Sequence, residues 1–186
     1  MKVQIIYSSL SGRTEKLAKA IGAEIEKRYT CTIHHLKDGA PPLDGDILLL
    51  GYWVDKGGPE KVMKEFMGTV EGKAVGVFCT LGAYADGAHA VHSIANGVNE
   101  VKDKNTVIGS YVCNGALSQS IIERFRERGT SGTHSASPEN EIRWEILKDH
   151  PTKAECALAA ERFLERIEAY ERHAAQNLRF QSVLPE

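Results

Sequence analysis

Residues 8–14, SSLSGRT, form the segment of this sequence best suited to binding an anion. They follow a short apolar run at residues 3–7 and precede residues 14–28, which carry apolar side chains at helical spacing. Hydroxyls donate to phosphate oxygens, and a helix N-terminus offers free N–H groups and a favourable dipole. The segment therefore predicts a phosphate cradle, although a serine-rich turn capped by Thr14 has the same composition.

Other phosphate-binding loops are excluded by the residues that they require. A P-loop needs a lysine before its last Ser or Thr, and a Rossmann loop needs three glycines, whereas this segment has only Gly12. A receiver domain needs acidic residues after the first strand, and a cysteine-dependent phosphatase needs an arginine in the loop of its cysteine. Neither pattern occurs here. The pattern that remains is Ser/Thr-x-Ser/Thr-Gly-x-Thr at residues 9–14.

Strand-like and helix-like segments alternate along the chain, which predicts right-handed βαβ units and a parallel sheet. The fold class is α/β, with a doubly wound five-stranded parallel sheet of order 2-1-3-4-5 and helices on both faces. In such sheets a ligand binds beyond the carboxyl ends of the strands, at the point where the strand order reverses. Strands are expected at 3–7, 29–36, 46–51, 73–80 and 106–113, and helices at 14–28, 59–67, 86–101, 118–128, 138–147 and 152–175.

Composition indicates one ordinary globular domain. The chain has 186 residues, of which 42% are hydrophobic and 26% charged, and its net charge of −2 does not favour nucleic acid or an anionic membrane as a partner. Its four cysteines are scattered without metal-ligand spacing, so neither a disulfide nor a metal site is expected.

The apolar start is too short for a signal peptide, which favours a cytoplasmic location. The domain is expected at 1–176, followed by a tail at 177–186.

The pattern at residues 9–14 resembles the FMN phosphate loop of the flavodoxin family, and the resemblance covers about residues 1–175. It implies a flavodoxin-like fold and one FMN bound without a covalent link. Arg13 stands where the family commonly has asparagine, so it either pairs with the phosphate or points to solvent. The phosphate contacts that the resemblance implies come from Ser9, Leu10, Ser11, Gly12, Arg13 and Thr14.

The resemblance also implies that the flavin ring lies between the segments that follow the third and fourth strands. Trp53 or Tyr52 on one side and Tyr84 on the other would stack on the ring or cover the end of the sheet. The Lys56–Gly57 or Gly57–Gly58 peptide would turn its carbonyl toward flavin N5 and stabilise a neutral semiquinone. The implied ring contacts are Tyr52, Trp53, Val54, Lys56, Gly57, Thr80, Leu81, Gly82, Ala83 and Tyr84.

The function implied is electron transfer by bound FMN to a partner reductase, without catalytic side chains. The alternative is a stand-alone FMN-dependent NAD(P)H oxidoreductase acting on quinones or nitro compounds. A module that has lost its flavin is disfavoured by the intact phosphate-loop pattern. Residues 113–115, 132–138 and 149–152 resemble a subgroup of small bacterial flavodoxin-family proteins, some of which serve a bilirubin-type tetrapyrrole reductase. The extension of the last helix would pack in a homodimer or remain an unpacked end.

Overall fold

A five-stranded parallel sheet forms the centre of the computed structural model, which describes residues 1–130 and 135–181. The strand order β2-β1-β3-β5-β6 is the predicted 2-1-3-4-5 order, because β4 is a short additional strand that pairs antiparallel with β3. Apolar residues fill the central strands, which are buried on both faces. The strands are β1 (Lys2–Tyr7), β2 (Thr30–His35), β3 (Ile47–Asp55), β4 (Gly58–Pro59), β5 (Ala74–Leu81) and β6 (Thr106–Asn114).

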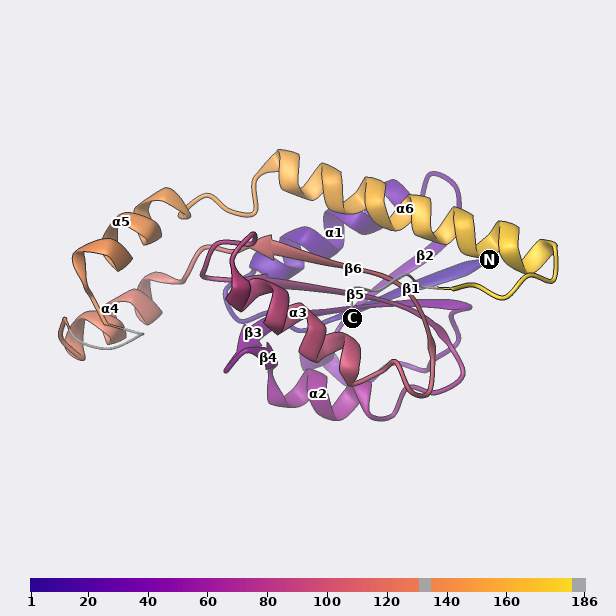
Figure 1. The fold of residues 1–186 in the computed structure, drawn as a ribbon, viewed down its shortest axis with the longest axis horizontal. Helices are drawn as coiled ribbons and strands as arrows, with labels where there is room; N and C mark the ends of the chain where they lie inside the picture. The colour runs from indigo at the N-terminus through magenta and orange to yellow at the C-terminus, as the bar shows by residue number, and fades with distance from the viewer. Residues whose placement is uncertain (131–134, 182–186) are drawn as a thin grey trace.

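Helices cover both faces of the sheet, as predicted (Figure 1). The helices α1 (Arg13–Ile25) and α6 (Lys153–Ala175) lie side by side on one face, and α2 (Lys61–Met67) and α3 (Ala88–Asn99) lie on the other. The core below α1 and α6 contains Leu17, Ile21, Ile25, Phe163 and Ile167, and the core of the opposite face contains Met63, Phe66, Met67, Val98 and Val101. The one-turn helix η1 (Leu36–Asp38) follows β2.

The segment after the third strand differs from its prediction. Strand β3 was expected to end at Gly51 but continues to Asp55, and it turns back through Lys56 and Gly57 to pair with β4. Both turn residues have positive φ, 49° and 81°, which suits the tight turns of β-hairpins.

The start of α2 differs for the same reason. Pro59 was expected in the first turn of this helix but belongs to β4, where an edge strand tolerates its missing N–H. Glu60 caps the helix instead, since its carboxylate accepts hydrogen bonds from the N–H groups of Val62 and Met63 at 2.7 and 2.9 Å. The hairpin therefore delays the helix to Lys61.

Two further helices, α4 (Gln119–Glu127) and α5 (Pro138–Ile146), lie beyond the carboxyl end of β6, outside both helix layers (Figure 1). We call this pair the α4–α5 lobe. Phe125 and Trp144 pack with ring centroids 5.9 Å apart, and Arg126 pairs with both carboxylate oxygens of Glu141 at 2.7 and 2.6 Å. Ser137 caps α5, since its side chain accepts from the Asn140 N–H. Residues 131–134, which overlap the 132–138 stretch that resembles the bacterial subgroup, lie outside the described residues, as does the end of the tail, 182–186.

Across the described ranges 1–130 and 135–181, no helix is both long and apolar enough to span a membrane. The same residues hold no group of three or more His, Cys, Asp or Glu side chains able to bind a metal ion. All four cysteines are free.

Candidate cofactor site

The phosphate-loop segment, residues 8–14, connects β1 to α1 at the switch point of the sheet. The Ser8 N–H donates to the Gly51 carbonyl at 2.9 Å, which ties the start of the loop to β3. Gly12 is the N-cap residue of α1 and has φ 78°, a left-handed conformation that glycine adopts without strain. Gly12 has no side chain to cap this helix, and among the described residues the Glu15 N–H of the first turn donates to Ser9 Oγ. The N–H groups of Arg13 and Thr14 are therefore the ones available to an anion.

Two polar side-chain atoms of this segment are buried without a partner. In the part of the chain that the structure describes, neither Ser8 Oγ nor Arg13 Nε has a hydrogen-bond partner. A buried donor without an acceptor is unfavourable by about 1–3 kcal/mol, and more for a charged group. Arg13 is the first residue of α1, so a phosphate oxygen at the helix start would accept from its guanidinium. The residues of the segment therefore fit the phosphate of FMN.

The other hydroxyls of the segment connect it to its surroundings. Thr14 is buried, and its Oγ1 lies 2.9 Å from Thr80 Oγ1 at the end of β5. Ser9 Oγ accepts from the Glu15 N–H at 3.4 Å, and Ser11 Oγ donates to the Ala116 carbonyl at 3.4 Å. These contacts join the loop to β5 and to the segment after β6.

A small cavity of about 50 Å³ lies beside the phosphate loop. It brings together residues predicted from the loop and from the ends of β3 and β5, namely Leu10, Ser11, Arg13, Trp53, Val54, Thr80, Leu81 and Gly82. The remaining wall was missed by sequence reasoning. It comes from the segment between β6 and α4 and consists of Gly115, Ala116, Leu117 and Ile121.

Other predicted ring contacts lie away from this cavity. Tyr52 is fully buried among the core residues below α3, and its hydroxyl donates to the Ser93 carbonyl at 2.7 Å. Burial raises the pKa of this tyrosine far above its ordinary value. Tyr84 is 46% exposed. Lys56 and Gly57 form the hairpin turn, where the Gly57 carbonyl accepts from Asn96 Nδ2 at 2.8 Å. Ala83 is half-buried and does not line the cavity.

The segment after β5 is held by polar contacts from β6 and α6. Asn114 Oδ1 accepts from the Ala85 N–H at 2.6 Å, and Asn114 Nδ2 lies 3.5 Å from Nδ1 of His150. That imidazole pairs with the Glu155 carboxylate at 2.7 Å. Although burial raises the pKa of Glu155, hydrogen bonds from the Thr152 N–H and from His150 outweigh it and hold this pKa below its ordinary value. Asn114, His150 and Glu155 thus form a polar anchor for the segment after β5, which we call the second flavin segment.

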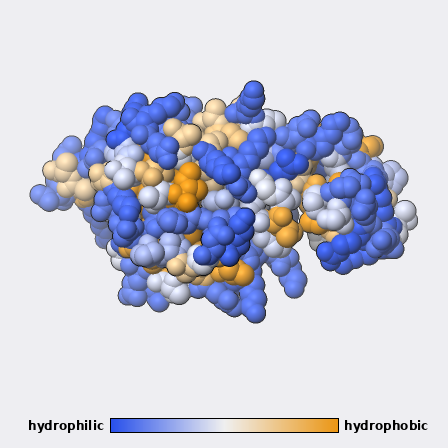
Figure 2. Space-filling view, turned by 180° about the vertical axis from the view of Figure 1, so that it is seen from behind, coloured by the Kyte–Doolittle hydropathy of each residue, from blue (hydrophilic) through white to orange (hydrophobic). Residues whose placement is uncertain are grey.

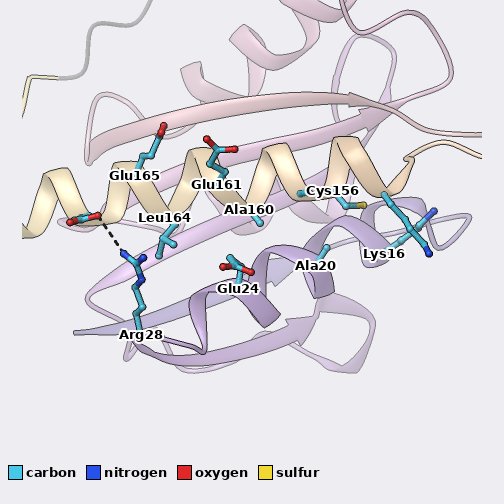
Figure 3. A pocket seen from close by; sticks show the side chains of 12 residues that line it. Lys16, Ala20, Glu24, Arg28, Cys156, Ala160, Glu161, Leu164 and Glu165 are labelled. Carbon is cyan, nitrogen blue, oxygen red and sulfur yellow. Dashed lines mark ion pairs between the residues drawn. The ribbon is translucent and has the colours of Figure 1, made fainter.

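A larger groove of about 690 Å³ lies elsewhere, on the surface between α1 and α6 (Figure 3). Charged side chains line its walls, among them Lys16, Glu24 and Glu161, and Arg28 forms an ion pair with Glu168 at 3.6 Å. The groove runs along the helix layer rather than at the carboxyl ends of the strands. It therefore does not compete with the switch-point cavity as the cofactor site.

Comparison with known proteins gives matches to one family. A family model described as a flavodoxin domain matches residues 4–164. A flavodoxin-like domain-containing protein BilS from Clostridioides difficile strain CD3 is 32% identical over 152 residues, which cover 81% of this chain and 84% of that protein. A BilS protein from Clostridium symbiosum is 30% identical and covers 68% of this chain and 74% of that protein.

A solved structure with a similar fold is oxidised flavodoxin 2 from Bacillus cereus, with a TM-score of 0.51 and 19% identity over 89% of this chain and 99% of that one. Megasphaera elsdenii flavodoxin has a TM-score of 0.50 and 24% identity, covering 59% of this chain and 84% of that one. The strand order, the phosphate loop at the switch point and the matching family model lead to one conclusion: the chain belongs to the flavodoxin family, whose cofactor is FMN.

Proposed function

We propose that this protein carries electrons on bound FMN and passes them to a separate reductase. The observation that carries the proposal is Arg13 Nε, a buried donor in the first residue of α1 that lacks a hydrogen-bond partner among the described residues. In a chain of the flavodoxin family, a phosphate placed there would accept from this group and from helix N–H groups together.

Each part of the site has its own task. The N–H groups at the start of α1, with Arg13, hold the phosphate, and Trp53 and Val54 provide an apolar surface for the ring. When bound, FMN supplies a ring system that accepts and releases electrons singly or in pairs. The protein therefore has only to bind the ring, orient it and leave an edge accessible.

The surroundings of the cavity suit a carrier that meets a partner protein. Among the described residues, those that line the cavity are apolar or hydroxyl-bearing apart from Arg13. Leu10, which lines the cavity, is 57% exposed, and Tyr84, in the segment after β5, is 46% exposed. These exposed side chains leave room for a partner protein to approach the ring.

Reduction under anaerobic conditions tests the proposal. We expect NADH or NADPH alone to leave the FMN-loaded protein oxidised over many minutes, because the proposal assigns reduction of the flavin to another protein. After photochemical reduction, mixing with a partner reductase should reoxidise the flavin rapidly. The relatives named BilS and the sequence resemblance make a bilirubin-type tetrapyrrole reductase the first partner to test. Fast reduction by a nicotinamide alone would contradict the carrier and favour the enzyme.

A further inference from the structure

We infer that the segment between β6 and α4 supplies the second wall of the flavin ring, with Leu117 and Ile121 as the residues that determine how the ring is covered. The inference deepens the proposed function and rests on FMN binding at the switch point. It adds a third protein segment to the two that the family resemblance had implied.

The position of Leu117 is the first observation. Its side chain lies directly against Gly82, since a Cβ built on Gly82 would come within 2.4 Å of Leu117 Cδ2 and 2.8 Å of Cγ. No side chain at position 82 fits while Leu117 occupies this place. The leucine therefore covers the backbone at Gly82, and both Leu117 and Trp53 line the same cavity.

The position of Tyr84 is the second observation. Sequence reasoning had assigned this aromatic to the second face of the ring, but it is 46% exposed and does not line the cavity. Leu117 and Ile121 are half-buried and do line it. An aliphatic wall from the β6–α4 segment thus occupies the role that had been given to the tyrosine.

Hydrogen bonds hold the backbone between β6 and α4, so a ring is accommodated by movement of the side chains. The Gly115 N–H donates to the Leu81 carbonyl at 2.8 Å, and the Ala116 N–H donates to the His150 carbonyl at 3.0 Å. The cavity of about 50 Å³ is far smaller than a drug-sized ligand pocket of roughly 300 Å³ or more. Leu117 must therefore change rotamer for a ring to enter, and it then packs on the ring.

The α4 helix carries apolar side chains that have no buried place in the core. None of its residues is fully buried, although it contains Ile121, Ile122 and Phe125. Figure 2 shows orange, hydrophobic atoms where the α4–α5 lobe adjoins the rest of the molecule. A flavin ring between Trp53 and Leu117 would extend this apolar contact and exclude water from one face of the ring.

Binding of FMN and of riboflavin, which lacks the phosphate, distinguishes a contact with the ring from a contact with the phosphate. Dissociation constants for FMN and riboflavin should be measured for the wild type, for Leu117→Ala and for the matched control Ile142→Ala, whose isoleucine is 61% exposed on α5. We expect Leu117→Ala to weaken both ligands by the same factor, roughly tenfold, because apolar contact with the ring is lost. The control should change neither. Leu117→Met, which conserves volume, should restore most of the affinity.

The absorption spectrum of bound FMN gives a second readout. The fine structure of its visible bands, which sharpens in apolar surroundings, should blur in Leu117→Ala and return in Leu117→Met. If the wild type binds FMN while Leu117→Ala leaves both affinities and the spectrum unchanged, Leu117 does not contact the ring and the inference is wrong. A loss confined to FMN would also overturn it, because it would place Leu117 at the phosphate. A wild type that does not bind FMN would instead refute the proposed function.

Discussion

In the proposed cofactor site, the phosphate end is one continuous segment, residues 8–14, whereas the ring end is assembled from the ends of β3 and β5 and from the segment after β6. The first is polar and contains buried donors without partners, Ser8 Oγ and Arg13 Nε. The second is mostly apolar and half-buried. Affinity for a charged group thus depends on a local turn and a helix start, while recognition of the ring depends on how distant parts of the fold meet.

The difference predicts that the two ends act independently. Changes at the phosphate end should alter the ratio of FMN to riboflavin affinity, because riboflavin lacks the phosphate. Changes at the ring end should weaken both ligands alike and leave the ratio unchanged. The variants below test whether the phosphate end and the ring end contribute independently to flavin binding.

The largest effect is expected at Arg13. Arg13→Ala removes a charged donor from the cradle, so FMN should bind about 10- to 100-fold more weakly, as expected for a lost charge-assisted hydrogen bond. Riboflavin binding should not change. Arg124→Ala, at an exposed position of α4, is the matched control. Flavin fluorescence titration measures all four constants. An equal loss for riboflavin would mean that Arg13 contacts the ring instead.

Trp53 should have the next largest effect. Trp53→Ala removes an aromatic surface from the ring end and should weaken FMN and riboflavin equally, by about 3- to 10-fold. Fluorescence gives an independent check, because Trp53→Phe should abolish most of the quenching that FMN causes. Trp144→Phe is the control, since Trp144 packs on Phe125 within the α4–α5 lobe. Quenching that persists in Trp53→Phe would remove Trp53 from the ring.

The hairpin turn should show a smaller effect. Gly57 has φ 81°, so Gly57→Thr should destabilise the turn by roughly 1 kcal/mol and narrow the separation between the two one-electron potentials. Gly58→Ala is a suitable control, because its φ is not positive and an added Cβ would lie 3.5 Å from Asn96 Cβ, an ordinary contact. Potentiometry measures the separation. Equal effects of the two variants would exclude a role for the Gly57 backbone.

The smallest effect is expected at the polar anchor of the second flavin segment. The pKa of Glu155 is lower in the folded state than in the unfolded chain, so its stabilising contribution is present above its ordinary pKa and disappears as pH falls through the folded value. Glu155→Gln should therefore lower the free energy of unfolding at pH 7 by about 0.5–1 kcal/mol. Urea unfolding at pH 7 and pH 3 checks this. A difference that is constant with pH would contradict it.

The order of the sheet could be predicted because its signals are local, and the pattern that predicts the phosphate cradle is local as well. Alternating apolar runs fix the order of strands and helices, and the cradle pattern lies within residues 9–14. The hairpin after β3 was missed although Lys56–Gly57 is a typical two-residue turn. Had β3 been extended to Asp55, strand alternation would have shown Tyr52 and Trp53 on opposite faces.

The wall formed by Leu117 and Ile121 had no such signal. These are ordinary aliphatic residues near the start of an amphipathic helix, and the local sequence fits a core contact equally well. Their place beside Gly82 depends on hydrogen bonds from Gly115 to β5 and from Ala116 to His150. Such contacts join residues far apart in the chain, so only the folded structure reveals them.

The central claim is that the segment at residues 8–14 binds the phosphate of FMN. Titration of the purified apoprotein with FMN and with riboflavin under the same conditions tests it most directly. Several charge-assisted hydrogen bonds to the phosphate predict one FMN per chain, bound at least about 100-fold more tightly than riboflavin. Equal affinity for the two flavins would contradict the assignment of this segment as the phosphate site.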